Sequence, residues 1–263
     1  MGKLISLAGI LVVLLAFAIK WDFSFVQAKA ASSVSSLNEL EDELQKQVML
    51  QKTDIAVGYS GDKQQLSANI GRLLKEVFAA DDYIAYIVDS YIYTIRTWGS
   101  TADIKVSVQY RESAAENKKV QEKVSAVLFT IIKPSMSQRD KIKAIHDWIV
   151  MNVAYDQSLE RYTAYDAVKS GQAVCQGYSL LMYRMLETAG IESRIIEGSV
   201  SSGSHVWNLV RLGSEWYHLD ATWDDPTPDR PGAVSYNYFL KSDKQMQVDH
   251  DWVKPYPAAN VSG

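Results

Sequence analysis

The sequence predicts a mixed α+β fold, and three observations indicate this class. Hydrophobic residues make up 47% of the 263 residues and aromatic residues 11%, which is an ordinary globular composition. Several segments repeat apolar residues at helical spacing, as Leu66, Ile70, Leu73 and Val77 do. Other segments alternate apolar and polar residues, as half-buried strands do. Helices and strands therefore follow one another along the whole chain.

The first half of the chain forms an α+β subdomain in this prediction. Residues 31–36 are a short flexible lead. Helices are expected at 37–48, 63–80 and 115–132, and strands at 54–59, 87–96 and 104–110. Residues 31–135 contain neither His nor Cys, so we expect this subdomain to be structural or to face a substrate.

The second half, residues 136–263, forms the other predicted domain. Ser137 precedes Asp140 by three residues, which is typical of a helix start. Residues 155–174 are irregular with one short helix. Cys175 lies in the first turn of the next helix or just before it, and Gly190 ends that helix. Three strands follow at residues 192–198, 205–212 and 215–222.

Charge and cysteine content exclude several classes of function. The formal net charge of −4 provides no basic surface for nucleic acid. A single cysteine rules out an intramolecular disulfide and any zinc or iron–sulfur site built from clustered cysteines. We expect neither a cofactor nor a metal.

Residues 1–30 have the order of an export signal. Lys3 precedes an uncharged apolar stretch at residues 4–19, and Ala28-Lys29-Ala30 resembles a cleavage site. The stretch is shorter than the ~20 residues of a bilayer span, although an uncleaved signal-anchor stays open. We expect a secreted or cell-envelope protein that meets the membrane only through this segment.

Cys175 is the first candidate for chemistry. A helix N-terminus favours an anion, so a thiolate there is stabilised and can act as a nucleophile. The alternative is a buried cysteine that packs as a small hydrophobe. The polar neighbours Gln176, Gly177 and Ser179 favour the nucleophile.

His205 and Asp220 fall on one predicted hairpin. A two-residue turn at Gly213-Ser214 pairs Trp207 with Asp220, which puts His205 and Asp220 on the same face. Diagonal neighbours of this kind lie roughly 7–8 Å apart at the backbone, within reach of a carboxylate. Taken singly, each residue has an ordinary explanation as a strand histidine or a strand-end turn residue. Together with Cys175 they predict a nucleophile, a base and an orienting acid.

The segment from Cys175 to Asp225 resembles the transglutaminase-like superfamily, whose fold is papain-like. The matching motifs are AVCQGYSLLMYRMLETAGIESRIIEG and HVWNLVRLGSEWYHLDATWDDP, preceded by KAIHDWIVMNVAYD and followed by YNYFLKSDKQM. The likeness extends from Ser137 to Trp252 and is greatest to bacterial exported members. It implies a Cys-bearing helix packed on an antiparallel sheet that carries His and Asp.

The resemblance also implies a Cys-His-Asp triad for acyl transfer. Cys175 would attack an amide carbonyl of a protein or peptide, His205 would take and return the proton, and Asp220 would orient the imidazole. The substrate would include cell-envelope proteins, and either water or an amine would complete the reaction. The alternatives are a non-catalytic envelope scaffold or binding module on the same fold, and a metal-dependent hydrolase.

The sequence also offers candidates for the oxyanion hole and for residues that support the triad. The backbone N–H of Cys175 is one donor; the resemblance gives no second, because Lys169 stands where papain-like proteases have Gln. The candidates for the oxyanion hole or the cleft are Gln172, Tyr162, Tyr165 and Trp207. We expect His146 to be packed and hydrogen-bonded, His218 to support the triad at most, and His250 to be structural. Zinc held by His205, His218 and Asp220 is an alternative that the spacing does not require.

Overall fold

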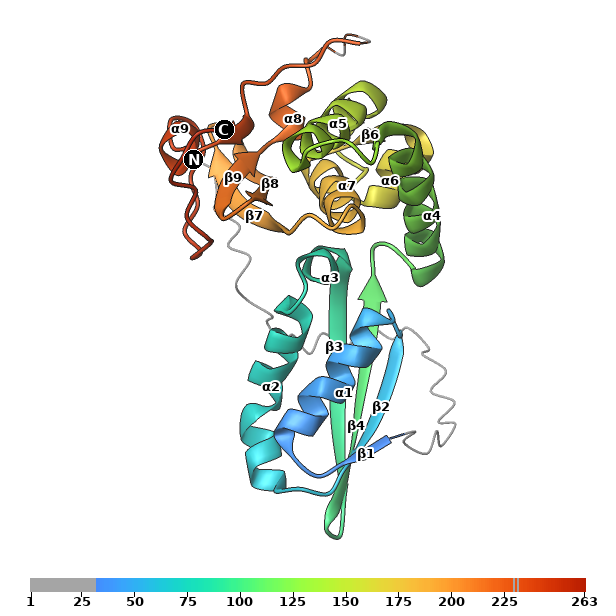
Figure 1. The fold of residues 1–263 in the computed structure, drawn as a ribbon. Coiled ribbons are helices and arrows are strands. Elements are labelled where there is room, and N and C mark those ends of the chain that lie inside the picture. Colours follow the sequence, from blue (N-terminus) through green and yellow to red (C-terminus); the bar gives the residue numbers. More distant parts are fainter. Residues whose placement is uncertain (1–31, 229, 231) are drawn as a thin grey trace.

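The computed structural model describes residues 32–228, 230 and 232–263, which form two lobes that meet at one end (Figure 1). The predicted signal or anchor at residues 1–30 lies outside the described residues. Within the described ranges, no helix is long and apolar enough to cross a membrane. The helices and strands mix in both lobes, which confirms the α+β class.

The N-terminal lobe is a four-stranded sheet in the order β1-β2-β4-β3, with two helices on one face (Figure 1). Its apolar core lies between that face and the helices. Ser32–Val34, expected as a flexible lead, instead pairs in parallel with β2 as an edge strand. The elements are β1 Ser32–Val34, α1 Leu37–Met49, β2 Asp54–Tyr59, α2 Lys63–Ala79, β3 Val88–Trp98 and β4 Thr101–Tyr110.

A short helix that the sequence pattern did not predict joins the two lobes. Helix α3, Asp82–Ile87, begins at Asp81, whose carboxylate accepts the Ile84 amide. It packs against α7 and β7 of the other lobe. The Asp82 carboxylate accepts two hydrogen bonds from the Arg194 guanidinium, at 2.7 and 3.0 Å. The lobes are therefore held together by α3.

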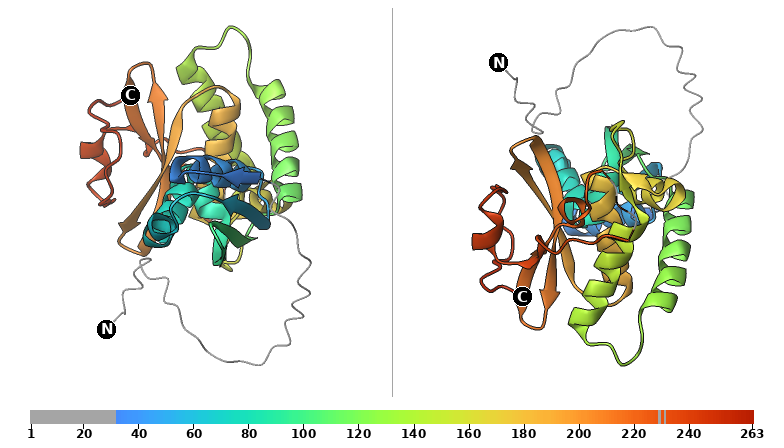
Figure 2. Two further views of the ribbon diagram at one scale, coloured as in Figure 1. Left: turned by 90° about the horizontal axis from the view of Figure 1, so that it is seen from below. Right: turned by 90° about the horizontal axis from the view of Figure 1, so that it is seen from above.

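The C-terminal lobe contains an antiparallel sheet in the order β10-β9-β8-β7, with α7 packed on one face and α9 on the other (Figure 2). Viewed from above and below, α4 and this sheet lie on opposite sides of α7 (Figure 2). The helices are α4 Ala114–Ile131, α5 Gln138–Asn152, α6 Ala164–Ser170, α7 Cys175–Thr188, α8 Ala221–Asp224 and α9 Asp243–Met246. The strands are β5 Ala154–Tyr155, β6 Gln172–Ala173, β7 Ser193–Val200, β8 Gly203–Leu212, β9 Glu215–Leu219 and β10 Phe239–Lys241.

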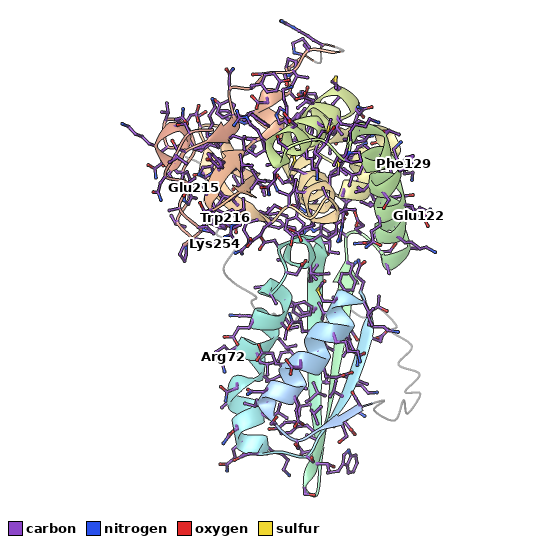
Figure 3. All side chains as sticks on the ribbon, in the orientation of Figure 1. Arg72, Glu122, Phe129, Glu215, Trp216 and Lys254 are labelled. Atoms are coloured by element: carbon purple, nitrogen blue, oxygen red, sulfur yellow. The ribbon has the colours of Figure 1, made fainter. Side chains whose placement is uncertain are left out.

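Helix α4, which we expected in the N-terminal subdomain, packs on α5, α6 and α7 of the C-terminal lobe. Its outward face carries Glu122 and Phe129, and Phe129 is 87% exposed (Figure 3). The chain crosses between the lobes after β4, around Arg111 and Glu112. Glu112 is fully buried, and its carboxylate accepts hydrogen bonds from the Tyr83 hydroxyl at 2.5 Å and the Tyr165 amide at 2.9 Å.

Strand β7 lies at the edge of its sheet, and side chains or loops cover its outward N–H groups. The Ile195 amide donates to Asp82 and the Glu197 amide to the Tyr256 hydroxyl, at 2.8 and 2.9 Å. The Ser199 amide donates to the Asp251 carbonyl at 2.8 Å. Residues from α3 and from the C-terminal segment thus occupy the positions where another strand would pair.

Candidate active site

Cys175 is the first residue of α7, as the sequence predicts. The pairing of β5 with β6 and the hydrogen bond from the Val174 amide to the Arg161 carbonyl, at 2.8 Å, fix the chain just before it. No hydrogen bond from the Cys175 amide is found within the described part of the chain. The side chain is half-buried. The predicted nucleophile therefore has an amide beside it of the kind that an oxyanion hole needs.

Helix α7 is tied to the strand that carries the histidine. The Ser179 hydroxyl donates to the Val206 carbonyl at 2.9 Å, and the Asn208 amide group donates to the Ser179 carbonyl at 3.1 Å. Gly177 lets the first turn approach β6 and the residue before α6, because a Cβ there would lie 2.6 Å from Ala173 Cβ and 2.9 Å from the Thr163 carbonyl oxygen. These contacts set the distance between the thiol and β8.

His205 and Asp220 meet as the hairpin geometry predicts. The pairing of Arg211 with Trp216 and of Leu209 with His218 confirms the two-residue turn. His205 Nε2 lies 2.7 Å from Asp220 Oδ2, and both side chains are buried. Strand β9 ends at Leu219, earlier than the expected residue 222.

Asp220 is therefore the residue before α8 and not a strand residue. Its Oδ1 accepts the Thr222 and Trp223 amides at 3.0 and 3.2 Å. The helix cap and the histidine contact use different oxygens of one carboxylate. The chain turns here because the Asp220 side chain replaces the backbone partners that a continuing strand would have supplied.

The surroundings of His205 favour its charged form. Burial lowers its pKa, but the charge of Asp220, the hydrogen bond to that carboxylate and the nearby Cys175 thiol outweigh burial and raise the pKa to about 10. Because Nε2 of His205 is hydrogen-bonded to Asp220, Nδ1 is the ring nitrogen of His205 that can bond to the Cys175 thiol. The site therefore holds an imidazolium beside Cys175 at neutral pH.

His250 is a site residue that the sequence did not reveal. It was expected to be structural, yet its Nε2 lies 3.1 Å from the same Asp220 Oδ2 that binds His205. Its Nδ1 lies 2.6 Å from Asp249 Oδ1, and the side chain is fully buried. The pattern gave no signal, because His250 lies 30 residues beyond Asp220 on a short connection after α9.

Trp207 and His218 support the site from behind. Trp207 is fully buried and stacks on His205 with ring centroids 5.7 Å apart, so it does not line the open cleft as considered above. Its indole donates to His218 Nδ1 at 2.9 Å, and His218 Nε2 lies 2.8 Å from Asp243 Oδ1. Burial lowers the pKa of His218, which keeps this ring neutral with its proton toward Asp243.

His146 is packed and hydrogen-bonded away from the triad, which confirms that prediction. Its Nδ1 lies 3.2 Å from Asp147 Oδ1 and its Nε2 lies 3.1 Å from Asp224 Oδ2. Burial opposes the charged ring, but the hydrogen bonds to Asp147 and Asp224 raise the His146 pKa. The ring joins α5 to α8.

A cleft between the lobes borders Gln176, the residue after Cys175. Its volume is about 570 Å³, and its walls include Tyr86 of α3, Gln176 of α7 and Tyr162. The Gln176 side-chain amide donates to the Tyr86 carbonyl at 3.0 Å, so the residue after Cys175 contacts the other lobe. Burial is the main cause that raises the pKa of Tyr155, and the nearby Cys175 is the next.

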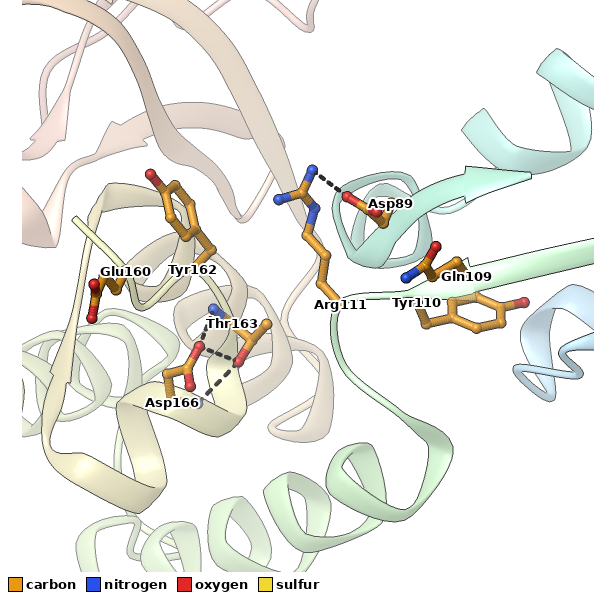
Figure 4. Close-up of a pocket in the computed structure, with 8 residues that line it drawn as sticks. All are labelled: Asp89, Gln109, Tyr110, Arg111, Glu160, Tyr162, Thr163 and Asp166. Atoms are coloured by element: carbon orange, nitrogen blue, oxygen red, sulfur yellow. Dashed lines mark hydrogen bonds and ion pairs between the residues drawn. The ribbon is translucent and has the colours of Figure 1, made fainter. Parts of the chain in front are cut away.

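A second hollow of about 340 Å³ continues the cleft (Figure 4). Arg111 and Asp89 face Tyr162 and Thr163 across it, and the Arg111–Asp89 ion pair spans 2.8 Å. Tyr162 thus borders both hollows, as its prediction as a cleft residue requires.

The other oxyanion candidates are not brought to the triad. Gln172 is exposed in β6, and among the described residues its side chain has no hydrogen-bond partner. The backbone amide of Tyr165 donates a hydrogen bond to the Glu112 carboxylate instead. The second oxyanion donor is thus not supplied by these residues.

One group of described side chains has the composition of a metal site. The nearest ligand atoms of His205, Asp220 and His250 lie within 4.8 Å of one another. Each of these atoms is already engaged in the two histidine–carboxylate hydrogen bonds. A metal would have to replace both bonds, so the arrangement does not fit one. His218, the third ligand of the zinc alternative, bonds Asp243 and Trp207 instead.

Comparison with known proteins agrees with the resemblance in the sequence. Residues 125–221 match the model of the transglutaminase-like superfamily, and this range includes Cys175, His205 and Asp220. Kyphoscoliosis peptidase of Mus musculus is 23% identical over 163 residues, 53% of this chain and 24% of the relative. The Homo sapiens protein of the same name is 24% identical over 144 residues, 46% of this chain and 22% of the relative. The chain therefore spans about a quarter of the length of these curated relatives.

Solved structures were also found. A TGase is 11% identical with a TM-score of 0.36, over 64% of this chain and 51% of that one. A candidate cysteine protease from Cytophaga hutchinsonii is 14% identical with a TM-score of 0.34, over 56% of this chain and 70% of that one.

Proposed function

From the transglutaminase-like region at residues 125–221, we propose that this chain is a cysteine-dependent acyl-transfer enzyme that acts on protein or peptide amides. The observation that carries the proposal is the His205–Asp220 contact of 2.7 Å beside the single cysteine of the chain. A non-catalytic scaffold has no need of a buried, ionised His–Asp pair next to a half-buried thiol.

The proposed reaction begins with attack of Cys175 Sγ on an amide carbonyl carbon. The C–N bond breaks, His205 gives a proton to the departing amine or ammonia, and a thioester remains. Water or a second amine then attacks the thioester carbon and loses a proton to His205. The C–S bond breaks, the carboxylic acid or new amide leaves, and the Cys175 thiolate and His205 imidazolium are restored. Because the pKa of His205 is raised to about 10, the imidazolium needed for the first proton transfer is present throughout the neutral range.

The interlobe cleft supports a polypeptide substrate. It borders Gln176, the residue after the nucleophile, and both lobes supply its walls. Among the acidic and basic residues there, Asp82 pairs with Arg194 and Glu197 with Lys254. The tyrosines Tyr86, Tyr162 and Tyr256 supply much of the remaining lining, which favours contact with an uncharged peptide stretch.

The test is incubation of the protein with casein and a fluorescent alkylamine. Amine incorporation supports transfer, and new fragments or released ammonia support hydrolysis. Cys175→Ala should abolish either activity. His146→Gln is the matched control and should keep activity, because His146 is a buried histidine that bonds two carboxylates outside the triad. If wild-type protein shows neither activity and iodoacetamide alkylates Cys175 like an ordinary thiol, the proposal fails and the scaffold alternative stands.

Export is a separate proposal based on the first 30 residues. Lys3, the apolar stretch at 4–19 and Ala28-Lys29-Ala30 support delivery across the membrane, with the stretch as an anchor if uncleaved. Cell fractionation and the mass of the mature N-terminus test it. A cytosolic protein with an intact N-terminus would contradict it.

A further inference from the structure

His250 lies between two carboxylates in the buried part of the molecule. Its Nε2 is 3.1 Å from Asp220 Oδ2 and its Nδ1 is 2.6 Å from Asp249 Oδ1. The segment that carries it is fixed, because Asp251 and Ser199 exchange two backbone hydrogen bonds at 2.8 and 2.9 Å. The ring of Trp223 packs against it with centroids 4.5 Å apart. The histidine therefore has little freedom to leave this position.

Hydrogen-bond chemistry determines which protons this ring carries. An ionised carboxylate only accepts, and a neutral imidazole has one N–H. Asp220 also accepts from His205 and from two backbone amides, and Asp249 also accepts from the Tyr238 hydroxyl at 2.6 Å. Both carboxylates are thus used as acceptors, and both bonds to His250 are made when each ring nitrogen carries a proton.

We propose that His250 is a positioning residue of the triad, which acts as an imidazolium through Asp220 on His205 and Cys175. The inference rests on the function proposed above. His250 shares one carboxylate oxygen with His205, and the two rings are 5.4 Å apart. Its charge compensates part of the Asp220 charge, and this favours the thiolate at Cys175. Its N–H also fixes the oxygen that orients the catalytic ring.

Other charged or titratable groups share these surroundings. Two hydrogen-bonded pairs, His218 with Asp243 and Tyr238 with Asp249, each join a neutral ring to a carboxylate, so each pair adds negative charge to these surroundings. Among the described residues, the titratable groups with a contact or charge interaction to His250 are His205, His218, Asp220, Tyr238 and Asp249. The hydrogen-bonded route from His250 to His205 runs through the Asp220 oxygen that both rings share.

The experiment measures iodoacetamide alkylation of the full chain across pH, where Cys175 is the sole cysteine. His250→Leu removes the donor and the charge, and His250→Gln keeps a donor for Asp220 but removes the charge. We expect the acidic limb of the alkylation rate to move to higher pH by about half a unit to one unit in both variants. We expect a larger loss of rate for Leu than for Gln. His146→Gln should keep the wild-type limb.

Two outcomes separate this inference from the proposed function. If the wild-type limb lies near ~8.5, as for a free thiol, the proposed function fails. If the wild-type limb lies lower but both folded His250 variants superimpose on it, His250 is merely structural and the inference is overturned. A second measurement does not depend on Cys175 reactivity: histidine ¹H–¹⁵N spectra at pH 7 show how many ring nitrogens of His250 carry a proton. Two N–H signals support the inference, and a single one refutes it.

Discussion

Replacing Asp220 by asparagine tests the proposed mechanism most directly. The side chain keeps its shape, but an NH₂ donor takes the place of one carboxylate oxygen acceptor. The amide oxygen of the substituted side chain would still accept the Thr222 and Trp223 amides that Asp220 accepts at 3.0 and 3.2 Å, so the cap of α8 is kept. The new NH₂ group would point at His205 Nε2, now 2.7 Å from a carboxylate oxygen. Nε2 must then accept, and the ring proton moves to Nδ1.

That proton would block catalysis, because Nδ1 is the nitrogen left for the thiol. The same reversal in a Ser-His-Asp triad costs about 10⁴ in kcat. At ~1.4 kcal/mol per tenfold, the expected loss here is about 5–6 kcal/mol of transition-state stabilisation. The cost to folding should be smaller, since only the two histidine contacts change, whereas Asp220→Ala also removes the cap at about 1 kcal/mol.

The assay compares the initial rate of amine incorporation or cleavage with the alkylation rate of Cys175 at pH 6, on protein whose melting curve shows it folded. Both rates should fall, by about a thousandfold or more for turnover and by a smaller factor for alkylation. A folded Asp220→Asn protein that keeps turnover within tenfold of wild type would refute the tautomer argument.

Three further predictions concern stability. Asp82→Ala removes both bonds to Arg194 and the acceptor of a β7 amide, so chemical denaturation should show a loss of about 1–2 kcal/mol; an unchanged midpoint would show that α3 does not hold the lobes. Gly198→Ala places a Cβ 2.5 Å from a Trp207 ring carbon and closer still to the Asp251 carbonyl oxygen, and calorimetry should show a Tm several degrees lower, from about 1–3 kcal/mol of overpacking; an unchanged Tm would mean that the Asp251 backbone and the ring can shift at no cost. The raised pKa of His146 means that the folded protein binds this proton more tightly, so its stabilisation is complete below pH 6.5 and is lost as pH rises through the folded pKa. Urea titrations should show this decline in wild type and a smaller one in His146→Gln, and equal slopes would contradict it.

The hairpin could be predicted because its constraints are local. The turn at Gly213-Ser214 fixes the register, and alternation then puts His205 and Asp220 on one face. The end of β9 was placed too late, because the alternating pattern continues through Thr222 while the Asp220 side chain has already capped a helix. A pattern of apolar residues carries no information about such a cap.

The parts that escaped prediction depend on contacts between distant segments. Helix α3 is only six residues long, and its sequence DYIAYI runs into strand-like residues, so the docking contacts of Asp82 and Tyr86 decide its form. His250 reaches Asp220 because the C-terminal segment returns to β7 at Ser199. No spacing along the chain encodes that return.

The covered edge of β7 connects the integrity of the candidate site to protection against self-association. Its amides are covered by Asp82 from the N-terminal lobe and by Tyr256 and Asp251 from the segment that carries His250. The proposed polypeptide substrate could not pair with β7 at those positions, because the amides there are already bonded. If either segment comes loose, the triad loses a support and a strand edge is exposed at the same moment. Damage that inactivates the molecule by this route would also make it prone to self-association, so loss of activity and aggregation should occur together.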